Sequence, residues 1–396
     1  MKRLLSFVLI ASFLLAPAAE AAPKKLAVKQ LQLLTTVGTP DEVSGVVVSG
    51  KTLIVYGSKA AKAYARAVDT TGKELWNLSL DQSAASSATA AAVDSVGDIW
   101  VVGATPLALG LTPPTPAATP VNPDNASVPP NSAAGNLQAV TLWKVTAAGV
   151  LTSTNTLPTS SVVLPTAISV DRNGASIVGI SATDKGSAGF LVNADKTGLF
   201  GKLQQIGLAS TTADAVVRHT DGSFTVAGSS SETLAGKKVA GVTDGVLVKI
   251  SKAQKITSVV RSSAVKGKRI WNSATSTLLL GGEVVAGGKT ETAITKFSSS
   301  FAPTWTYRFP STGPALTVGS TYGLFMSTGA IAQLNWNPKV ATPLLLTFDA
   351  KGAVVAADSG PVGQKEVLGA VLSKELGLLV VTSSADTVSI FTLIPR

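Results

Sequence analysis

The sequence repeats a pair of β-hairpins at intervals of about 50 residues, and this repeat limits the possible folds more than any other feature. The first hairpin reads VDSVGDIWVVGAT (93–105), VDRNGASIVGISA (170–182) and RHTDGSFTVAGSS (218–230) in three of the units. A Gly-containing turn between runs rich in Val, Ile, Thr and Phe indicates a β-hairpin. A second hairpin follows in each unit, as in LVKISKAQKITSVV (247–260), so one unit supplies four strands.

Counting the units gives seven. Their second strands are expected to start near Thr52, Asp98, Ala175, Ser223, Ser276, Tyr322 and Leu376. The spacing is 46 to 54 residues except for one interval of 77. That long interval contains the segment 107–138, which carries seven of the 20 prolines and no charged residue except Asp124. Such a composition is typical of a polyproline-like or disordered loop, so we interpret the segment as an insertion.

A four-stranded unit repeated every 40 to 55 residues or so is the signature of a β-propeller blade, which buries its two faces only against neighbouring blades. We therefore predict an all-β, single-domain, seven-bladed β-propeller over residues 22–396, with the Pro-rich insertion at 107–138. The last unit supplies only three strands, whereas KLAVKQLQLLTTVG (25–38) belongs to no unit. We expect this N-terminal strand to complete the last blade, which closes the ring and leaves no open edge.

The blade motifs resemble those of a known group. The pattern DG-x-F-x-V-A-G-S, followed by L-V-K-x-S/D-x-x-G, resembles the repeats of secreted bacterial seven-bladed β-propellers, whose blades are distantly quinoprotein-like or WD40-like. AVDTTGKELW (67–76) is similar to the tryptophan-docking motif of quinoprotein-type propellers, although tryptophan recurs at that place only as Trp76 and Trp305. The resemblance covers about residues 25–396 and implies a blade architecture. The cysteine pair and the calcium-binding carboxylates of quinone dehydrogenases are missing, so it implies no quinone cofactor.

The N-terminus has the layout of a secretory signal peptide. Lys2 and Arg3 precede an apolar run over 4–15, and Ala19 and Ala21 stand at the positions that a signal peptidase requires. We expect residues 1–21 to be cleaved near Ala21 and the mature chain to be secreted, either extracellular or in the cell envelope. No later stretch reaches about 18 uninterrupted apolar residues, so no membrane span is predicted. The lack of cysteine agrees with a protein stabilised by a large core and excludes a lipid-modified cysteine.

Few residues could carry catalysis. His219 is the only histidine, and it fills the turn position that Asp94 and Asp171 fill in sister repeats, so we interpret it as a turn residue. Most acidic residues start turns as well, and Asp214, Glu283 and Asp358 are the least readily explained. We predict no catalytic residue, no metal and no cofactor. An extracellular carbohydrate-active enzyme, a glycoside hydrolase or lyase, remains the alternative, because two carboxylates about 5 to 10 Å apart could come from different blades.

The favoured function is that of a non-catalytic binding or scaffold propeller. The net charge is +10, but the lysines are scattered, so no nucleic-acid partner is expected. Propellers usually bind ligands on the loops between the second and third strands and between successive blades, which is an analogy at the level of the fold. The predicted ligand-binding residues are Trp336, Asn335, Asn337, Lys339, Trp271, Lys268, Arg269, Lys237 and Lys238. Basic groups beside an indole could hold an anionic glycan or a protein at the cell surface, although Trp271 could instead be wedged between blades. A monomer is expected.

Overall fold

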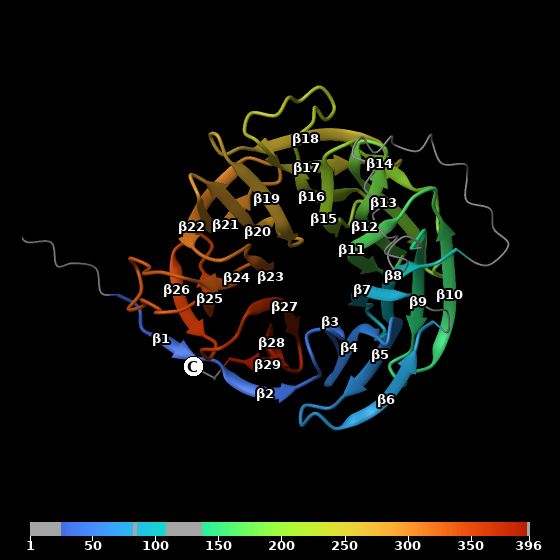
Figure 1. The fold of residues 1–396 in the computed structure, drawn as a ribbon, viewed down its shortest axis with the longest axis horizontal. Helices are drawn as coiled ribbons and strands as arrows, with labels where there is room; N and C mark the ends of the chain where they lie inside the picture. The colour runs from blue at the N-terminus through green and yellow to red at the C-terminus, as the bar shows by residue number, and fades with distance from the viewer. Residues whose placement is uncertain (1–24, 82–84, 108–136, 394–396) are drawn as a thin grey trace, which may run out of the picture.

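The computed structural model describes residues 25–81, 85–107 and 137–393, and its strands form seven sheets around a central axis (Figure 1). The predicted all-β, seven-bladed propeller is confirmed. The predicted signal peptide and most of the Pro-rich insertion lie outside the described residues. Within the described ranges, no helix is long and apolar enough to cross a membrane.

The first four blades each take four consecutive strands of the chain. Blade 1 contains β3 (Val43–Ser49), β4 (Thr52–Lys59), β5 (Lys62–Val68) and β6 (Glu74–Ser79). Blade 2 contains β7 (Ser87–Val93), β8 (Ile99–Thr105), β9 (Ala139–Val145) and β10 (Leu151–Pro158). Blade 3 contains β11 (Val163–Asp171), β12 (Gly174–Thr183), β13 (Gly186–Asp195) and β14 (Gln204–Ile206). Blade 4 contains β15 (Thr211–Arg218), β16 (Phe224–Ser230), β17 (Asp244–Ile250) and β18 (Ile256–Ser262).

The last two of the remaining three blades also receive strands from the N-terminus. Blade 5 contains β19 (Lys268–Ala274), β20 (Leu279–Ala286), β21 (Lys289–Phe297) and β22 (Pro303–Pro310). Blade 6 contains β23 (Leu316–Val318), β24 (Tyr322–Ser327), β25 (Thr342–Phe348) and β26 (Val354–Ser359), together with β1 (Val28–Gln30). Blade 7 contains β27 (Glu366–Ser373), β28 (Gly377–Ser383) and β29 (Val388–Thr392), together with β2 (Gln32–Thr36).

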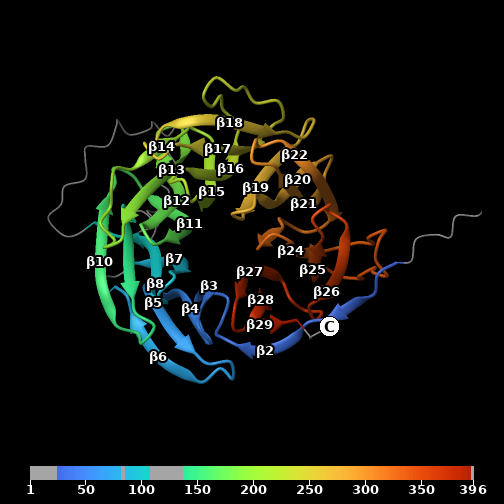
Figure 2. The same cartoon turned by 180° about the vertical axis from the view of Figure 1, so that it is seen from behind.

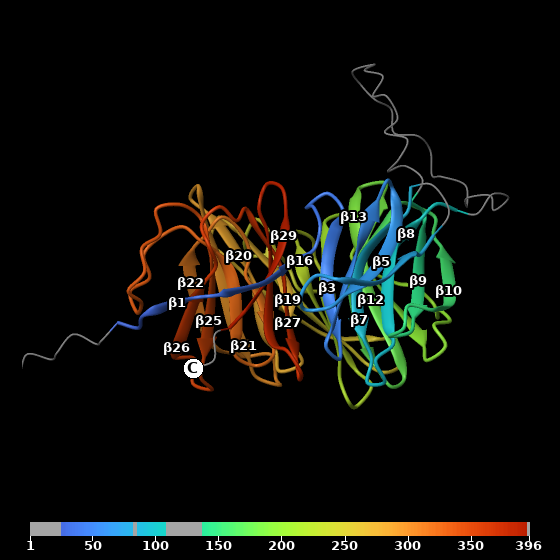
Figure 3. The same ribbon diagram turned by 90° about the horizontal axis from the view of Figure 1, so that it is seen from below.

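The antiparallel order within each blade sorts the connections onto two ends of the ring. The first strand of each blade lies nearest the central axis and the last lies at the rim (Figures 1 and 2). The strands run along the ring axis, as the side view shows (Figure 3). Connections between second and third strands and between successive blades therefore lie at one end, which we name the loop face. The remaining hairpin turns lie at the other end, which we name the turn face.

The N-terminal segment closes the ring as predicted, but it is two strands rather than one. β2 pairs antiparallel with β29 and completes blade 7, whereas β1 pairs in parallel with β26 at the rim of blade 6. Leu31 separates the two strands, and its N–H donates to the Ser359 carbonyl at 2.8 Å. Its side chain is 7% exposed and packs in the core between these blades. The break thus lets the chain step from one blade to the next while burying Leu31.

Two tryptophans at the rim dock on the following blade. Trp76 Nε1 donates to the Ala147 carbonyl at 3.1 Å, and a Cβ added to Gly149 would lie 2.5 Å from the Trp76 indole. A Cβ added to Gly352 would likewise lie 2.6 Å from the Trp305 indole. Both glycines have positive φ, so the contact needs glycine for its conformation and for its lack of a side chain. The predicted similarity to a tryptophan-docking motif therefore corresponds to a physical contact at two blade interfaces.

Candidate functional site

His219 is a turn residue, as its repeat position indicates. It lies on the turn face of blade 4, where its N–H donates to the Ser223 carbonyl and its carbonyl accepts from the Gly222 N–H, both at 2.9 Å. Asp94 makes the matching two bonds in blade 2. His219 Nε2 lies 2.7 Å from Thr225 Oγ1, and burial lowers the pKa of the imidazole. The ring is thus held against its own hairpin, as expected for a turn residue.

Several acidic side chains on the turn face accept hydrogen bonds from the backbone of their own turns. Asp69, Asp195 and Asp349 each use Oδ1 to accept from the backbone N–H groups two and four residues later, at 2.8 to 3.1 Å. Hydrogen bonds from the Thr71 and Thr197 hydroxyls lower the pKa of Asp69 and Asp195, respectively. These carboxylates therefore stabilise turns, which is the role that the sequence predicted for them.

Two carboxyl groups away from the turns have raised pKa values. Asp214 is the extra residue in a β-bulge of β15, beside the central axis, and burial raises its pKa to about 6 against the effect of a 2.5 Å hydrogen bond from Thr212 Oγ1. Burial also raises the pKa of Glu283, against the charge of Lys268. No other acid contributes to either shift, and the described chain holds no group of three or more His, Cys, Asp or Glu able to bind a metal ion.

The most elaborate structure on the loop face joins blades 4 and 5. We name it the blade 4–5 loop cluster: the connection 231–243 between β16 and β17, and the connection 263–267 between β18 and β19. The two connections pair with each other, since the Val242 N–H donates to the Gly267 carbonyl at 2.8 Å. A second bond follows from the Arg269 N–H to the Thr243 carbonyl, also at 2.8 Å. The cluster is therefore one bonded unit rather than two separate loops.

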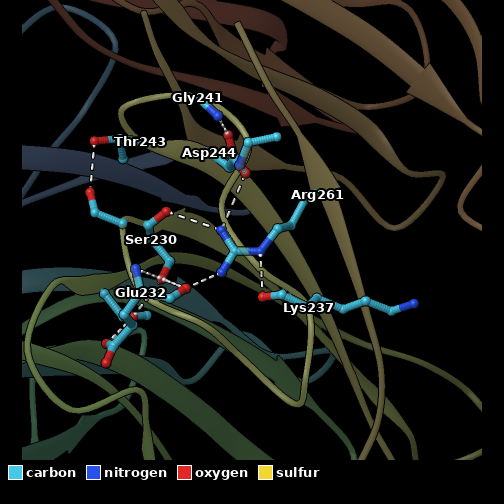
Figure 4. A network of polar contacts seen from close by, with 10 residues as sticks. Ser230, Glu232, Lys237, Gly241, Thr243, Asp244 and Arg261 are labelled. Atoms are coloured by element: carbon cyan, nitrogen blue, oxygen red, sulfur yellow. Dashed lines mark hydrogen bonds and ion pairs between the residues drawn. The ribbon is translucent and has the colours of Figure 1, made fainter. Parts of the chain in front are cut away.

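Arg261, at the end of β18, organises this cluster (Figure 4). Its Nε donates to the Lys237 carbonyl at 3.1 Å, and its Nη1 donates to the Ser230 carbonyl at 3.2 Å and to Asp244 Oδ2 at 3.3 Å. Nη2 donates to the Glu232 carbonyl. Because one planar guanidinium holds three carbonyls and a carboxylate, the path of 231–243 is fixed from inside.

The acidic side chains of the cluster face inward as well. Asp244 is fully buried and accepts from the Ala240 and Gly241 N–H groups at 2.9 Å. Burial acts to raise its pKa, but these bonds and the charge of Arg261 lower it overall. The pKa of Glu232 is lowered as well: burial acts to raise it, but hydrogen bonds to Oε1 outweigh that effect. The donors are the Thr211 hydroxyl at 2.6 Å and the backbone N–H groups of Leu208, Ala209 and Ser210 at 2.8 to 3.3 Å.

Five of the predicted ligand-binding residues map to this region, and they divide into exposed and buried groups. Lys237, Lys238 and Lys268 are exposed. Trp271 is 0% and Arg269 6% exposed, because both lie on the innermost strand of blade 5, where Trp271 packs against blade 4. The Arg269 guanidinium stacks 4.0 Å from the Trp271 ring, and burial lowers the pKa of Arg269 to about 10, helped by the charge of Arg308. Trp271 and Arg269, which we predicted as ligand-binding residues, are therefore buried and not available to contact a ligand on the loop face.

The other predicted residues lie on blade 6, in the connection between β24 and β25. They are Asn335, Trp336, Asn337 and Lys339. The first three line a small hollow of about 270 Å³ together with Lys25. Trp336 is half-buried, and its Nε1 donates to Ser327 Oγ at 3.0 Å, while Lys339 is exposed. The structure thus splits the predicted site into a basic part on blades 4 and 5 and an amide and indole part on blade 6.

Sequence reasoning missed a hollow of the loop face at blade 3. It measures about 880 Å³, and it is lined by the connection 159–162, the hairpin tip 183–185 and side chains such as Leu203 and Leu208. It lies beside β14, which has three residues, whereas β6, β10, β18, β22 and β26 have six to eight. The segment LFGKLQQIG (199–207) lacks the long alternating run of those strands, which is the signal that could have located the hollow.

Comparisons with known proteins agree with this architecture. The WD40 domain of Toxoplasma gondii coronin is similar with a TM-score of 0.53 at 9% sequence identity, over 94% of this chain and 90% of that chain. A protein from Lactobacillus plantarum has a TM-score of 0.44 at 10% identity, over 84% of this chain and 87% of that chain. No protein-family model and no curated protein matches the sequence. The coronin comparison shows a shared fold, and the chain is a seven-bladed β-propeller.

Proposed function

We propose that this protein is a secreted, non-catalytic binding or scaffold propeller whose loop face holds a glycan or protein partner at the cell surface or in the envelope. The observation that carries the proposal is the Arg261 network, which fixes a long connection on that face while leaving lysine side chains exposed. A loop that is already ordered loses less conformational freedom when a partner binds, so more of the contact energy appears as affinity.

A carbohydrate-active enzyme is the second candidate, and Asp214 is the residue that favours it. A carboxyl group with a pKa of about 6 has the property of a general acid at neutral pH. Hydrolysis by two carboxylates needs a second acid close enough to act on the same bond, and the hydrogen-bond partner described for Asp214 is the Thr212 hydroxyl rather than a second carboxyl group. This is why binding is the better-supported function.

A binding screen of residues 22–396 tests the proposal. The chain is applied to a glycan array and used in pull-downs from envelope extracts, beside a loop-face variant, Trp336→Ala, and a turn-face variant, Lys252→Gln/Lys255→Gln. We expect the loop-face change to weaken capture and the turn-face change to leave it intact, with unfolding curves confirming that both variants fold. Loss of capture only in the turn-face variant, or turnover of a glycan that Asp214→Asn abolishes, would contradict the proposed function.

A further inference from the structure

A group of exposed lysines lies at the loop face of blades 4 and 5. Its members are Lys237, Lys238, Lys266, Lys268 and Lys289, and we name them the lysine group. The hydrogen bonds of Arg261 hold the backbone at Lys237. Lys268 forms a bridge with Thr243 on one side and pairs with Val285 on the other. The β20–β21 hairpin that carries Lys289 is therefore joined to the blade 4–5 loop cluster.

The carboxylates near the lysine group are already engaged. Asp244 is paired with Arg261, Glu232 is held by backbone amides, and Glu291 forms an ion pair with Arg308. Glu283 is half-buried and makes no ion pair with Lys268, although the charge of Lys268 acts on its pKa, which burial raises. In the described part of the chain, no member of the lysine group forms an ion pair. The surface therefore presents positive charge that an external anion can match.

We propose that the lysine group binds an acidic polysaccharide through the carboxylates of successive sugar units. This inference rests on the proposed binding function and names its ligand class. The five lysines are all exposed, and they are spread over the connection 231–243, the connection 263–267 with the first residue of β19, and the first residue of β21, so several separate segments supply the charge. A chain with charges at regular intervals can contact several of them at once, which raises the overall affinity above that of any single contact.

The residue types favour a polysaccharide over other polyanions. Lysine offers a single charge on a flexible stem, whereas the nearby arginines, whose fork suits phosphate, are turned inward: Arg261 holds the loop and Arg269 is buried. An acidic peptide would use a free sheet edge or a groove for its side chains, but the two connections of the loop cluster pair with each other. Membrane binding is stronger where buried apolar area adds to the electrostatic attraction, but the large exposed hydrophobic side chains of the described cluster are only Val242 and Val265.

Polygalacturonate is the probe for the test, with dextran as the neutral control. Binding to residues 22–396 is measured by calorimetry at about 0.05 and 0.5 M salt, since salt screens contacts between exposed charges. The variant Lys237→Gln/Lys238→Gln is compared with Lys252→Gln/Lys255→Gln, which makes the same charge change on the turn face of the same blade. We expect polygalacturonate to bind at low salt, dextran not to bind, and the loop-face variant to bind about tenfold more weakly.

Each other outcome overturns the inference. Equal weakening in the two variants would mean that net charge rather than the lysine group binds the polymer. Equally tight binding of poly-L-glutamate or of phosphatidylglycerol vesicles, lost in the same loop-face variant, would assign the surface to a peptide or a membrane. If polygalacturonate fails to bind while the screen above still finds a partner for the loop face, this inference fails and the proposed function stands. If neither experiment finds a partner, both fail.

Discussion

The ionisation of Asp214 makes the stability of the folded protein depend on pH. Its pKa is about 6 in the folded protein because of burial, against about 4 for an ordinary aspartate. Between about pH 4 and 6 the folded state holds more protons than the unfolded state, so stability falls as the pH rises through this range and stays lower above it. Asn lacks this titration. We expect Asp214→Asn to be more stable than the wild type by about 2 kcal/mol at pH 8 and to lose that gain near pH 4.

Urea unfolding of both proteins at pH 4, 6 and 8 measures this difference. The variant can still accept the Thr212 hydrogen bond through its amide oxygen, so the comparison isolates the charge. A gain of equal size at all three pH values would show that packing, not ionisation, distinguishes the two side chains.

Single residues were predictable where their partners are close in sequence. The turn roles of Asp69, Asp195 and His219 depend on backbone groups within four residues, which a repeat alignment exposes. Trp271 could not be placed in the same way. Its strand pattern allowed either an exposed or a wedged ring, and only the packing of blade 5 against blade 4 decides between them.

At the scale of elements, the connection 231–243 should depend on Arg261. Arg261→Met would remove the bonds to three carbonyls and leave the fully buried Asp244 carboxylate without its counter-charge, which costs about 3 to 5 kcal/mol. We expect this loss in urea unfolding, together with faster hydrogen exchange at Ala240 and Gly241. Adding Asp244→Asn removes the unpaired charge and should recover part of the stability. If the double variant is less stable than Arg261→Met by the full cost of a second independent change, the two side chains do not act as a pair.

The starts of the strands could be predicted from the hydrophobic pattern, but the break between β1 and β2 could not. The second strands start within a few residues of the predicted positions, because alternation and turn glycines mark them locally. The break at Leu31 leaves the apolar pattern of 25–38 unchanged, since it reflects a step between two blades rather than a local signal. The sequence also does not reveal the role of Glu232, because its partners are backbone amides of a different connection.

For the whole molecule, the number of blades could be predicted from the sequence. Each blade has to bury both faces of its sheet, so the same hydrophobic pattern recurs at a spacing that can be counted. The join of the ring was also readable, as a unit short of one strand at one end of the chain and a spare strand at the other. Lys237, Lys238 and Lys268 could be placed on the loop face from the sequence, but the burial of Arg269 and the bridge that joins the loop cluster to β19 could not, because they depend on how different blades pack together.

Ring closure should make β2 far more important to stability than β1. A chain that begins at Leu31 loses β1 and the contacts of Leu26 with the β24–β25 connection, all at blade 6, whereas a chain that begins at Val37 also loses β2 and the buried Leu31. The second change exposes the edge of β29 and opens the core between blades 6 and 7. We expect the second truncation to cost at least about 3 kcal/mol more than the first, from lost burial and hydrogen bonds. Urea unfolding measures the costs, and size-exclusion chromatography should detect association through the open edge only in the shorter chain. Equal stability of the two truncations would mean that the ring is held by its blade interfaces without the closing strand.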